Sequence, residues 1–208
     1  MELKEILQIV FFIVSALVLI GIVTFAWVFI YRKFYYTKHF ESCHYSIVRK
    51  IVKRYDYRLI NNFIFKTGEK KHDRINHIIF GEKYAYLVFS RNFDGDLAGK
   101  AEDKSLQFVQ RNGERLYTLN QYTYMNTIID KLCQMTGLQK NFFIGILMTN
   151  DDCNNFVDSK FDNLYIVKKS DLSKAIKGIE ARDIGKLNEE MLQTAILKLS
   201  ELNRRKDG

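Results

Sequence analysis

The sequence predicts an α/β or α+β domain, with a mixed central β-sheet flanked by helices, preceded by one transmembrane helix. Three observations lead to this fold class. Residues 6–31 contain no charged side chain. Between residues 58 and 119, short runs rich in Ile, Tyr and Phe alternate with turn residues, as strands do. Other segments repeat their apolar residues at helical spacing, and strands combined with such helices form layered domains.

The uncharged stretch is longer than the roughly 20 residues that cross a bilayer as a helix. Only Gln8, Ser15 and Thr24 interrupt it. A signal peptide and a buried core helix are the alternatives, but the stretch is too long for either and has no basic start or small-residue cleavage site. Residues 1–38 are therefore expected to form a transmembrane anchor with a juxtamembrane segment.

Basic residues concentrate on the C-terminal side of the anchor. One Lys precedes the apolar stretch, whereas seven Lys and Arg follow it between residues 32 and 54. Because positive flanks stay on the cytoplasmic side, the sequence predicts a single-pass protein of the cell membrane with a cytoplasmic C-terminal domain. Trp27 and Tyr31 suit the aromatic belt at that interface.

The domain, expected to cover residues 39–180, should begin with an amphipathic helix within residues 42–57. Its apolar side carries Ile47, Val48, Ile51, Val52 and Tyr55, next to His44, and its other side carries Arg49, Lys50, Lys53 and Arg54. Residues 58–66, 74–81 and 83–90 follow as strands. Residues 91–99 are expected to form a glycine-containing loop. Residues 106–119 form a hairpin around Asn112-Gly113, a strong turn signal.

The second half of the domain is expected to supply a helix, two strands and two further helices. Residues 121–135 have helical periodicity, and Gly137 follows as a C-cap. Residues 141–149 form a nearly continuous apolar run, typical of a central strand covered on both faces, here by the 121–135 helix and the C-terminal helix. Residues 163–169 form the next strand, and Ser170 caps a helix that runs to Lys177. Within residues 181–208, a helix over 187–203 packs on the domain.

The composition limits the chemistry that the chain can carry. Net charge is +8, and residues 1–38 contribute four Lys or Arg and two Glu, which leaves +6 for the remainder. This balance suits either phosphate binding or an anionic membrane surface. The cysteines Cys43, Cys133 and Cys153 are far apart and predict isolated thiols rather than a metal site. Motifs for nucleotide phosphates, serine hydrolases and zinc proteases are absent, so no cofactor is expected.

The stretches RINHIIF, YAYLVFSRNFDGDLAG and LYTLNQYTYMNTIIDKL, in this order of elements, resemble the nuclease-related domain (NERD) family of restriction-endonuclease-like nucleases. The resemblance covers roughly residues 40–177. Its most specific part is residues 91–99, where the family has a Lys-Asn pair and a loop that closes on Gly-x-x-x-Gly; Asn92, Gly95 and Gly99 keep this register. The resemblance implies a restriction-endonuclease-like sheet, whose active site holds Mg²⁺ with carboxylates at two strand ends.

The catalytic positions that the resemblance implies are all changed. Asn76 stands where the family has a metal-binding Asp, Phe89 where it has the Glu of Glu-x-Lys, and Arg91 where it has the Lys. An amide is a weak ligand for Mg²⁺, a phenyl ring is none, and Arg does not lose its proton. On the leading helix Cys43-His44 replaces Gly-Glu. No catalytic residue and no metal ligand are therefore expected.

Some positions retain a binding role in this interpretation: His77, Arg91, Asn92 and Gln121. His77 is more often a satisfied core residue than a ligand when it lies on an apolar strand. Arg91 is either a solvated charge or a phosphate contact. Gln121 aligns with the family's Asn-Pro-x-x-Gln motif in one of two registers, the other starting at Asn120, or it simply begins a helix.

The sequence thus leads to three hypotheses of function. The first is a membrane-anchored, catalytically inactive binding module, with DNA, RNA or an unknown protein as partner. The second is a divergent Mg²⁺-dependent nuclease with relocated carboxylates, for which Asp94, Asp96 and Asp73 are the candidates. The third is a membrane protein scaffold.

Overall fold

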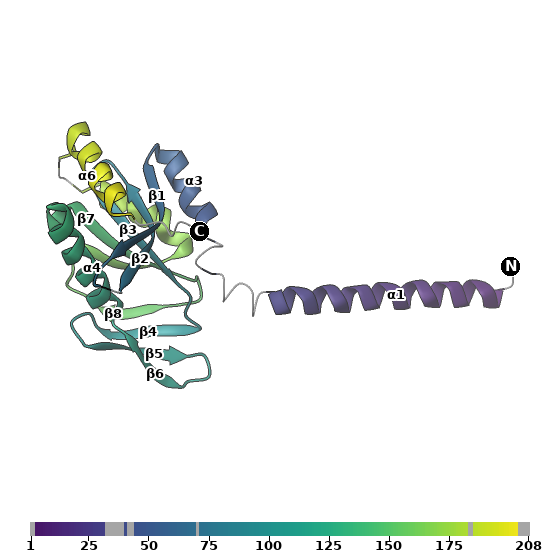
Figure 1. Cartoon of the computed structure of the whole chain (residues 1–208). Helices are drawn as coiled ribbons and strands as arrows, with labels where there is room; N and C mark the ends of the chain where they lie inside the picture. The colour runs from purple at the N-terminus through teal and green to yellow at the C-terminus, as the bar shows by residue number, and fades with distance from the viewer. Residues whose placement is uncertain (1–2, 32–39, 41–43, 70, 183–184, 204–208) are drawn as a thin grey trace. The chain divides into compact units, whose positions relative to one another are not determined.

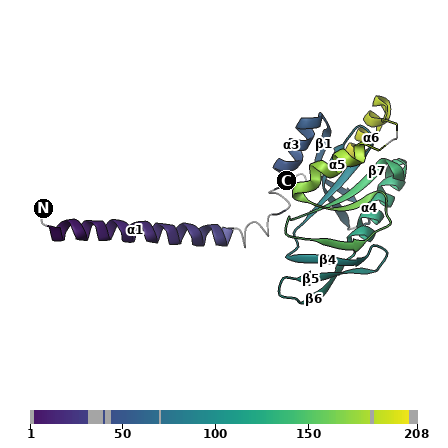
Figure 2. The same cartoon turned by 180° about the vertical axis from the view of Figure 1, so that it is seen from behind.

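The computed structural model describes residues 3–31, 40, 44–69, 71–182 and 185–203, with side chains from residue 10 onward (Figure 1). It divides into two compact units, Met1–Cys43 and His44–Gly208. Figure 2 shows the same chain from behind. The expected basic juxtamembrane segment, residues 32–39, and Cys43 lie outside the described residues.

The first unit contains helix α1, Leu3–Ile30. Its 28 residues span about 42 Å at 1.5 Å per residue. Residues 10–30 are long and apolar enough to cross a bilayer, and this is the single such helix among the described residues. The Thr24 hydroxyl bonds to the carbonyl oxygens of Ile20 and Gly21 at 2.9 Å, so a polar side chain within the span is satisfied by its own helix.

The second unit is a mixed α+β domain around a five-stranded sheet, which confirms the predicted fold class. The strand order is β1-β2-β3-β7-β9. These strands are β1 Arg58–Lys66, β2 His72–Phe80, β3 Ala85–Arg91, β7 Phe143–Thr149 and β9 Leu164–Lys168. The strands β1, β2 and β3 pair antiparallel, whereas β3, β7 and β9 run parallel. The carboxyl ends of β3, β7 and β9 therefore meet at one edge.

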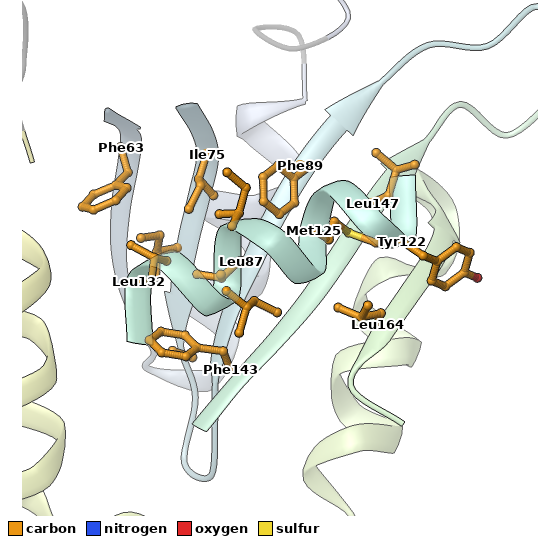
Figure 3. Close-up of a cluster of buried hydrophobic side chains, with 14 of the residues drawn as sticks. Phe63, Ile75, Leu87, Phe89, Tyr122, Met125, Leu132, Phe143, Leu147 and Leu164 are labelled. Atoms are coloured by element: carbon orange, nitrogen blue, oxygen red, sulfur yellow. The ribbon is translucent and has the colours of Figure 1, made fainter. Parts of the chain in front are cut away.

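Helices cover both faces of this sheet. On one face lie α4 (Gln121–Thr136) and α6 (Glu189–Leu202), and on the other lie α3 (Tyr45–Tyr55) and α5 (Leu172–Glu180). Figure 3 shows side chains of the sheet and of α4 meeting in the first of these two cores. Every residue of β7 is buried, which confirms a central strand covered on both faces.

One prediction about this core is wrong, because α6 does not cover the second face of β7. Ala195 and Leu199 of α6 belong to the same apolar cluster as α4, while Leu172 and Ile176 of α5 and Val48 of α3 fill the opposite cluster. An amphipathic pattern shows that a helix has a buried side, but it does not say which face of a sheet receives that side.

A second, four-stranded sheet has the order β6-β5-β4-β8. Its strands are β4 Gly95–Lys100, β5 Ser105–Gln110, β6 Arg115–Leu119 and β8 Asn155–Asp158. The predicted hairpin is β5-β6. The expected loop over residues 91–99 is wrong, because most of it is β4, and β8 was not expected. Gly95 has φ of +156°, and a Cβ there would lie 2.1 Å from the Val109 carbonyl oxygen, so β4 approaches β5 too closely for any other residue.

Strands β1 and β2 both change the face toward which their alternate side chains point. In β1, Ile60 and Phe63 pack in the same core although they are three residues apart, and in β2 the same is true of Ile75 and Ile78. Asn62, with φ of +52°, lies at the change in β1, opposite the break in β2. A strand with unbroken alternation would put such pairs on opposite faces.

The predicted helix boundaries hold with one exception. Helix α4 ends at Gly137, whose φ of +69° allows the left-handed cap. The predicted Ser170 cap is wrong: Asp171 precedes α5, and the Ser170 N–H donates to Asp151 Oδ1 at 3.0 Å. A short 3₁₀ turn over Lys169–Asp171 displaces the helix start, and α5 runs on to Glu180.

Helix α6 packs on the domain, as predicted, and protects an edge strand. It lies beside β1, the outer strand of the five-stranded sheet. The Ile64 N–H of β1 donates to the side-chain oxygen of Asn203, directly after α6, at 3.0 Å. Part of this sheet edge is therefore closed to other strands.

Candidate functional site

The candidate site is the strand edge around Asn76 of β2 and Phe89 and Arg91 of β3. The β2-β3 ladder runs from the Phe80 and Ala85 pair to the His77 and Val88 pair. Beyond it, the Ser90 N–H donates to the side-chain oxygen of Asn76 at 2.8 Å. Both residues are buried. Asn76 therefore continues the pairing of the two strands with its side chain where the backbone pairing ends.

Phe89 occupies the position where the resemblance implies a metal-binding Glu. Its ring is 5% exposed and lies edge to face with Tyr124 of α4, with ring centroids 5.7 Å apart. In Figure 3 the Phe89 ring is part of the cluster that packs around α4. The position is part of the apolar core, and a carboxylate there would be removed from water without a partner.

Arg91 ends β3 and is exposed. Its backbone is in register with Thr149 at the end of the parallel strand β7. Within the described part of the chain, its guanidinium makes no hydrogen bond and no salt bridge. Burial and the charge of Asp73 raise the pKa of the Tyr124 hydroxyl, while Arg91 opposes this shift. The three side chains thus influence one another at the strand edge.

Asp73 is the carboxylate near this edge, and it is already neutralised. Its side chain is largely buried, and Lys131 of α4 donates to Asp73 Oδ2 at 3.1 Å. A buried carboxylate paired with a lysine cannot take up a cation without losing that partner. Asp73 therefore links β2 to α4 through Lys131, and its carboxylate is not available to a metal ion.

His77 lies on the other side of the sheet, away from Phe89. Its Nδ1–H donates to Asn61 Oδ1 at 2.8 Å, and its ring stacks on Tyr45 of α3. Burial, followed by the charges of Arg74 and His44, lowers the pKa of His77 to about 4. The ring is therefore neutral at physiological pH, and its Nε2 is buried with no hydrogen-bond partner among the described residues. The sheet separates His77 from Arg91.

Gln121 begins α4, and its amide bonds to the Leu119 carbonyl oxygen at 2.8 Å. The neighbouring Asn120 has the larger structural role, which sequence reasoning missed. Its side-chain oxygen accepts from the N–H groups of Tyr122 and Thr123, and its Nδ2 donates to the Ala101 carbonyl oxygen at 3.0 Å. Asn directly before a periodic helix is a known N-cap signal and could have identified it.

Asn92 follows β3 and is half-buried, without a hydrogen bond to the described residues. Sequence reasoning also missed Asn150, at the end of β7, which fixes the next turn of this loop. Asn150 Oδ1 accepts from the Phe93 N–H at 2.8 Å, and its Nδ2 donates to the Phe93 carbonyl oxygen at 2.9 Å. Asn150 thus holds the loop that begins at Asn92 through both the N–H and the carbonyl group of Phe93.

The two aspartates considered as replacement ligands are engaged elsewhere. Asp94 forms an exposed salt bridge with Arg111 at 3.2 Å, and Asp96 Oδ1 accepts from the Asn154 N–H at 2.8 Å. Among the residues that the structure describes, no group of three or more His, Cys, Asp or Glu side chains could hold a metal ion.

Of the described thiols, Cys153 is buried and Cys133 is half-buried. Burial raises the pKa of Cys153 to about 11 and, with a contribution from Asp130, raises the pKa of Cys133. Cys153 lines a groove of about 430 Å³ between β7, β8 and β9, with Thr149 and Lys168 at the carboxyl ends of their strands. Both thiols are protonated at neutral pH, so neither is an activated nucleophile.

Comparisons with known proteins do not assign the chain to a family. No family model matches it, and no curated protein matches it. Among solved structures, it is similar to AF1548, a protein of unknown function whose crystal structure aligns over 79% of this chain and 89% of that chain. The sequences are 11% identical and the TM-score is 0.37, so this similarity carries no functional argument.

Proposed function

We propose that this protein is a membrane-anchored binding module, built on a nuclease-like sheet and without nuclease activity. The proposal rests on one observation: among the residues that the structure describes, the strand edge offers no unengaged carboxylate. Phe89 packs on Tyr124, the Asn76 oxygen accepts from Ser90, and Asp73 is paired with Lys131. Because Mg²⁺ binds in proteins through carboxylate and other hard oxygen ligands, this edge is unsuited to hold it.

The divergent nuclease is the weaker alternative. It would require Asp94 and Asp96 to leave the Arg111 side chain and the Asn154 N–H. Even then, Arg91 occupies the position where the resemblance implies a lysine that helps to activate water, and Arg does not lose its proton. The scaffold hypothesis needs no chemistry at the strand edge, and it differs from the leading proposal only in the partner.

Nucleic acid is the partner that the exposed Arg91 supports, since an unpaired guanidinium is a good bidentate ligand for phosphate. We expect the fragment 38–208 to bind duplex DNA more weakly as salt rises. Replacing Arg91 with Ala should reduce the slope of log affinity against log salt by about 1 if it neutralises one phosphate. Arg115→Ala, on the outer strand β6, is the matched control. Equal slopes for both variants would remove Arg91 from the interface.

The nuclease-like register can be tested by restoration. The triple variant Asn76→Asp, Phe89→Glu, Arg91→Lys should bind Mg²⁺, and because the new carboxylates repel each other without the ion, Mg²⁺ should raise its unfolding temperature. At a concentration of 100 times Kd, binding adds about 2.7 kcal/mol to the free energy of unfolding.

Calorimetry and thermal melts of the fragment 38–208, with and without Mg²⁺, measure this effect. Tyr117→Asp with Phe156→Glu adds two carboxylates at exposed positions on β6 and β8, the two outer strands of the four-stranded sheet, and should show no response. A folded triple variant that ignores Mg²⁺ would show that these positions do not form the family's metal site. Metal-dependent DNA cleavage by the unmodified fragment would instead replace the binding module with the enzyme.

The cytoplasmic location of the domain is part of this proposal. In the variant Asn112→Cys, a thiol is placed at the exposed β5-β6 turn, away from the buried Cys153 and the half-buried Cys133. A membrane-impermeant maleimide should label it only after cell lysis. Labelling in intact cells would reverse the orientation and exclude cytoplasmic nucleic acid as partner.

A further inference from the structure

Helix α3 presents four cations on its outer side. Arg49, Lys50, Lys53 and Arg54 are all exposed, and α3 contains no acidic residue. At about 100° per residue, these positions fall within an arc of about 140°. None of the four forms a salt bridge with another described residue. Lys53 and Arg54 suit the negative end of the helix dipole, but Arg49 and Lys50 lie a turn earlier and are not explained by it.

The inner side of α3 fixes this orientation. Val48 and Ile51 are buried in the cluster that α3 shares with α5, so the cations cannot turn inward. On α5, Lys174 and Lys177 are exposed as well. We call these six residues of α3 and α5 the basic face. The exposed acids on the same two helices and their ends are Asp56 and Asp171, and Glu180 is half-buried and accepts from the Tyr86 hydroxyl.

Cations elsewhere in the domain more often have acidic partners. Arg111 contacts both Asp94 and Asp152, and further pairs join Arg58 to Glu189, Lys140 to Asp130 and Lys186 to Glu82. Salt bridges thus neutralise part of the positive charge elsewhere in the described domain and none of it on the basic face. An unpaired group of cations on one face attracts an extended anionic partner.

The short connection between the apolar helix and α3 favours a membrane surface as that anionic partner. Thirteen residues, and so fourteen residue-to-residue steps, separate Tyr31, at the end of the apolar helix, from Tyr45, at the start of α3. Fully extended, these fourteen steps reach about 50 Å at about 3.5 Å per step, so the start of α3 can lie no farther than that from the end of the apolar helix. Such a tether gives a high effective concentration for a surface contact.

We propose that the basic face docks on the anionic phospholipid headgroups of the membrane that holds α1. This inference rests on the membrane anchor in the proposed function. Because the apolar side of α3 is already buried in the domain, the contact is electrostatic and involves no insertion into the acyl region. It should therefore disappear at high salt, unlike the binding of an amphipathic helix that inserts.

Amine acylation, followed by mass spectrometry, tests this docking on the full chain in lipid nanodiscs. The acylation rates of Lys50 and Lys53 report on the basic face. Lys100, Lys104 and Lys160, in and near the four-stranded sheet, are internal controls. We expect acylation of Lys50 and Lys53 to slow in discs of phosphatidylcholine with phosphatidylglycerol, compared with phosphatidylcholine alone. High salt should restore the rate, while the control lysines stay unchanged.

The variant Arg49→Gln, Arg54→Gln removes two charges and keeps both reporter lysines. With about a fivefold contribution per cation, it should lower the ratio of docked to undocked chains about 25-fold. Lys104→Gln with Arg115→Gln removes the same amount of charge from the four-stranded sheet and the turn before β5. It should leave the ratio of docked to undocked chains unchanged.

Equal acylation in neutral and anionic discs would overturn the inference and leave the anchor intact. Protection of Lys50 and Lys53 from acylation that persists at high salt would also overturn it, because it would indicate that the helix inserts into the acyl region. Protection by duplex DNA in neutral discs, without protection by anionic lipid, would assign the basic face to nucleic acid. A full chain that fails to enter the discs would overturn both the anchor and this inference.

Discussion

Replacing Asn76 with Ala tests whether its side chain continues the β2-β3 pairing. The variant removes the oxygen that the Ser90 N–H approaches at 2.8 Å, and Ser90 is 1% exposed, so water cannot replace that acceptor without opening the strands. A buried donor left without a partner costs about 1–3 kcal/mol. For a domain of this size, each kcal/mol lowers the unfolding temperature by about 2–4 °C. The expected decrease is therefore about 2–12 °C.

Urea and thermal unfolding of the fragment 38–208, followed by circular dichroism, measure this change. The urea midpoint should fall while the m-value stays constant, because the variant alters one contact rather than the extent of folding. Asn126→Ala is the matched control: Asn126 lies on the half-exposed side of α4, and Ala favours a helix. If Asn76→Ala unfolds like the unmodified fragment, Ser90 has another acceptor, and Asn76 is not a structural residue.

Ile146→Asp, in the fully buried strand β7, should prevent folding, because an unpaired buried charge costs several kcal/mol against a total free energy of unfolding of about 5–15 kcal/mol. Ile146→Val is the control and should fold. A cooperative melt of the Asp variant near that of the unmodified fragment would contradict the strand order. His77, with a pKa of about 4, stays neutral in the folded state while the unfolded ring titrates near 6.5. The unfolded chain thus binds more protons between these values, and stability should fall as pH is lowered through this window, by up to about 3 kcal/mol. His77→Gln should remove this dependence, and the exposed His72→Gln should retain it; equal pH profiles for both variants would show that His77 is not the group responsible.

The sequence was sufficient for the elements that depend on local chemistry. Residues 121–135 and Gly137 predicted α4 and its cap, and residues 106–119 predicted the β5-β6 hairpin, because periodicity and turn residues act over short distances. It was insufficient for β4, in which two glycines suggest a loop until β5 lies beside it, and for β8, which is short and polar. Ser170 suited an N-cap, but the Asp151 side chain accepts from its backbone N–H.

The candidate site shows the same limit at a longer range. The substitutions at Asn76, Phe89 and Arg91 were visible in the sequence, but the partners that engage them come from distant segments: Tyr124 packs on Phe89 and Ser90 donates to Asn76. His77 was grouped with Arg91 as a candidate binding residue because of the resemblance to the nuclease-related domain family. The change of face within β1 and β2, which no alternation pattern predicts, leaves His77 on the α3 side.

The contact between Asn203 and Ile64 joins the end of the domain to its first strand, and this affects its biosynthesis. Helix α1 leaves the ribosome before the domain does. Strand β1 emerges soon after, but α6, which is followed by the residue that closes part of its outer edge, is synthesised more than a hundred residues later. Until then, β1 exposes hydrogen-bonding groups that other chains can pair with. The nascent chain should therefore need protection from neighbouring chains until α6 has been made.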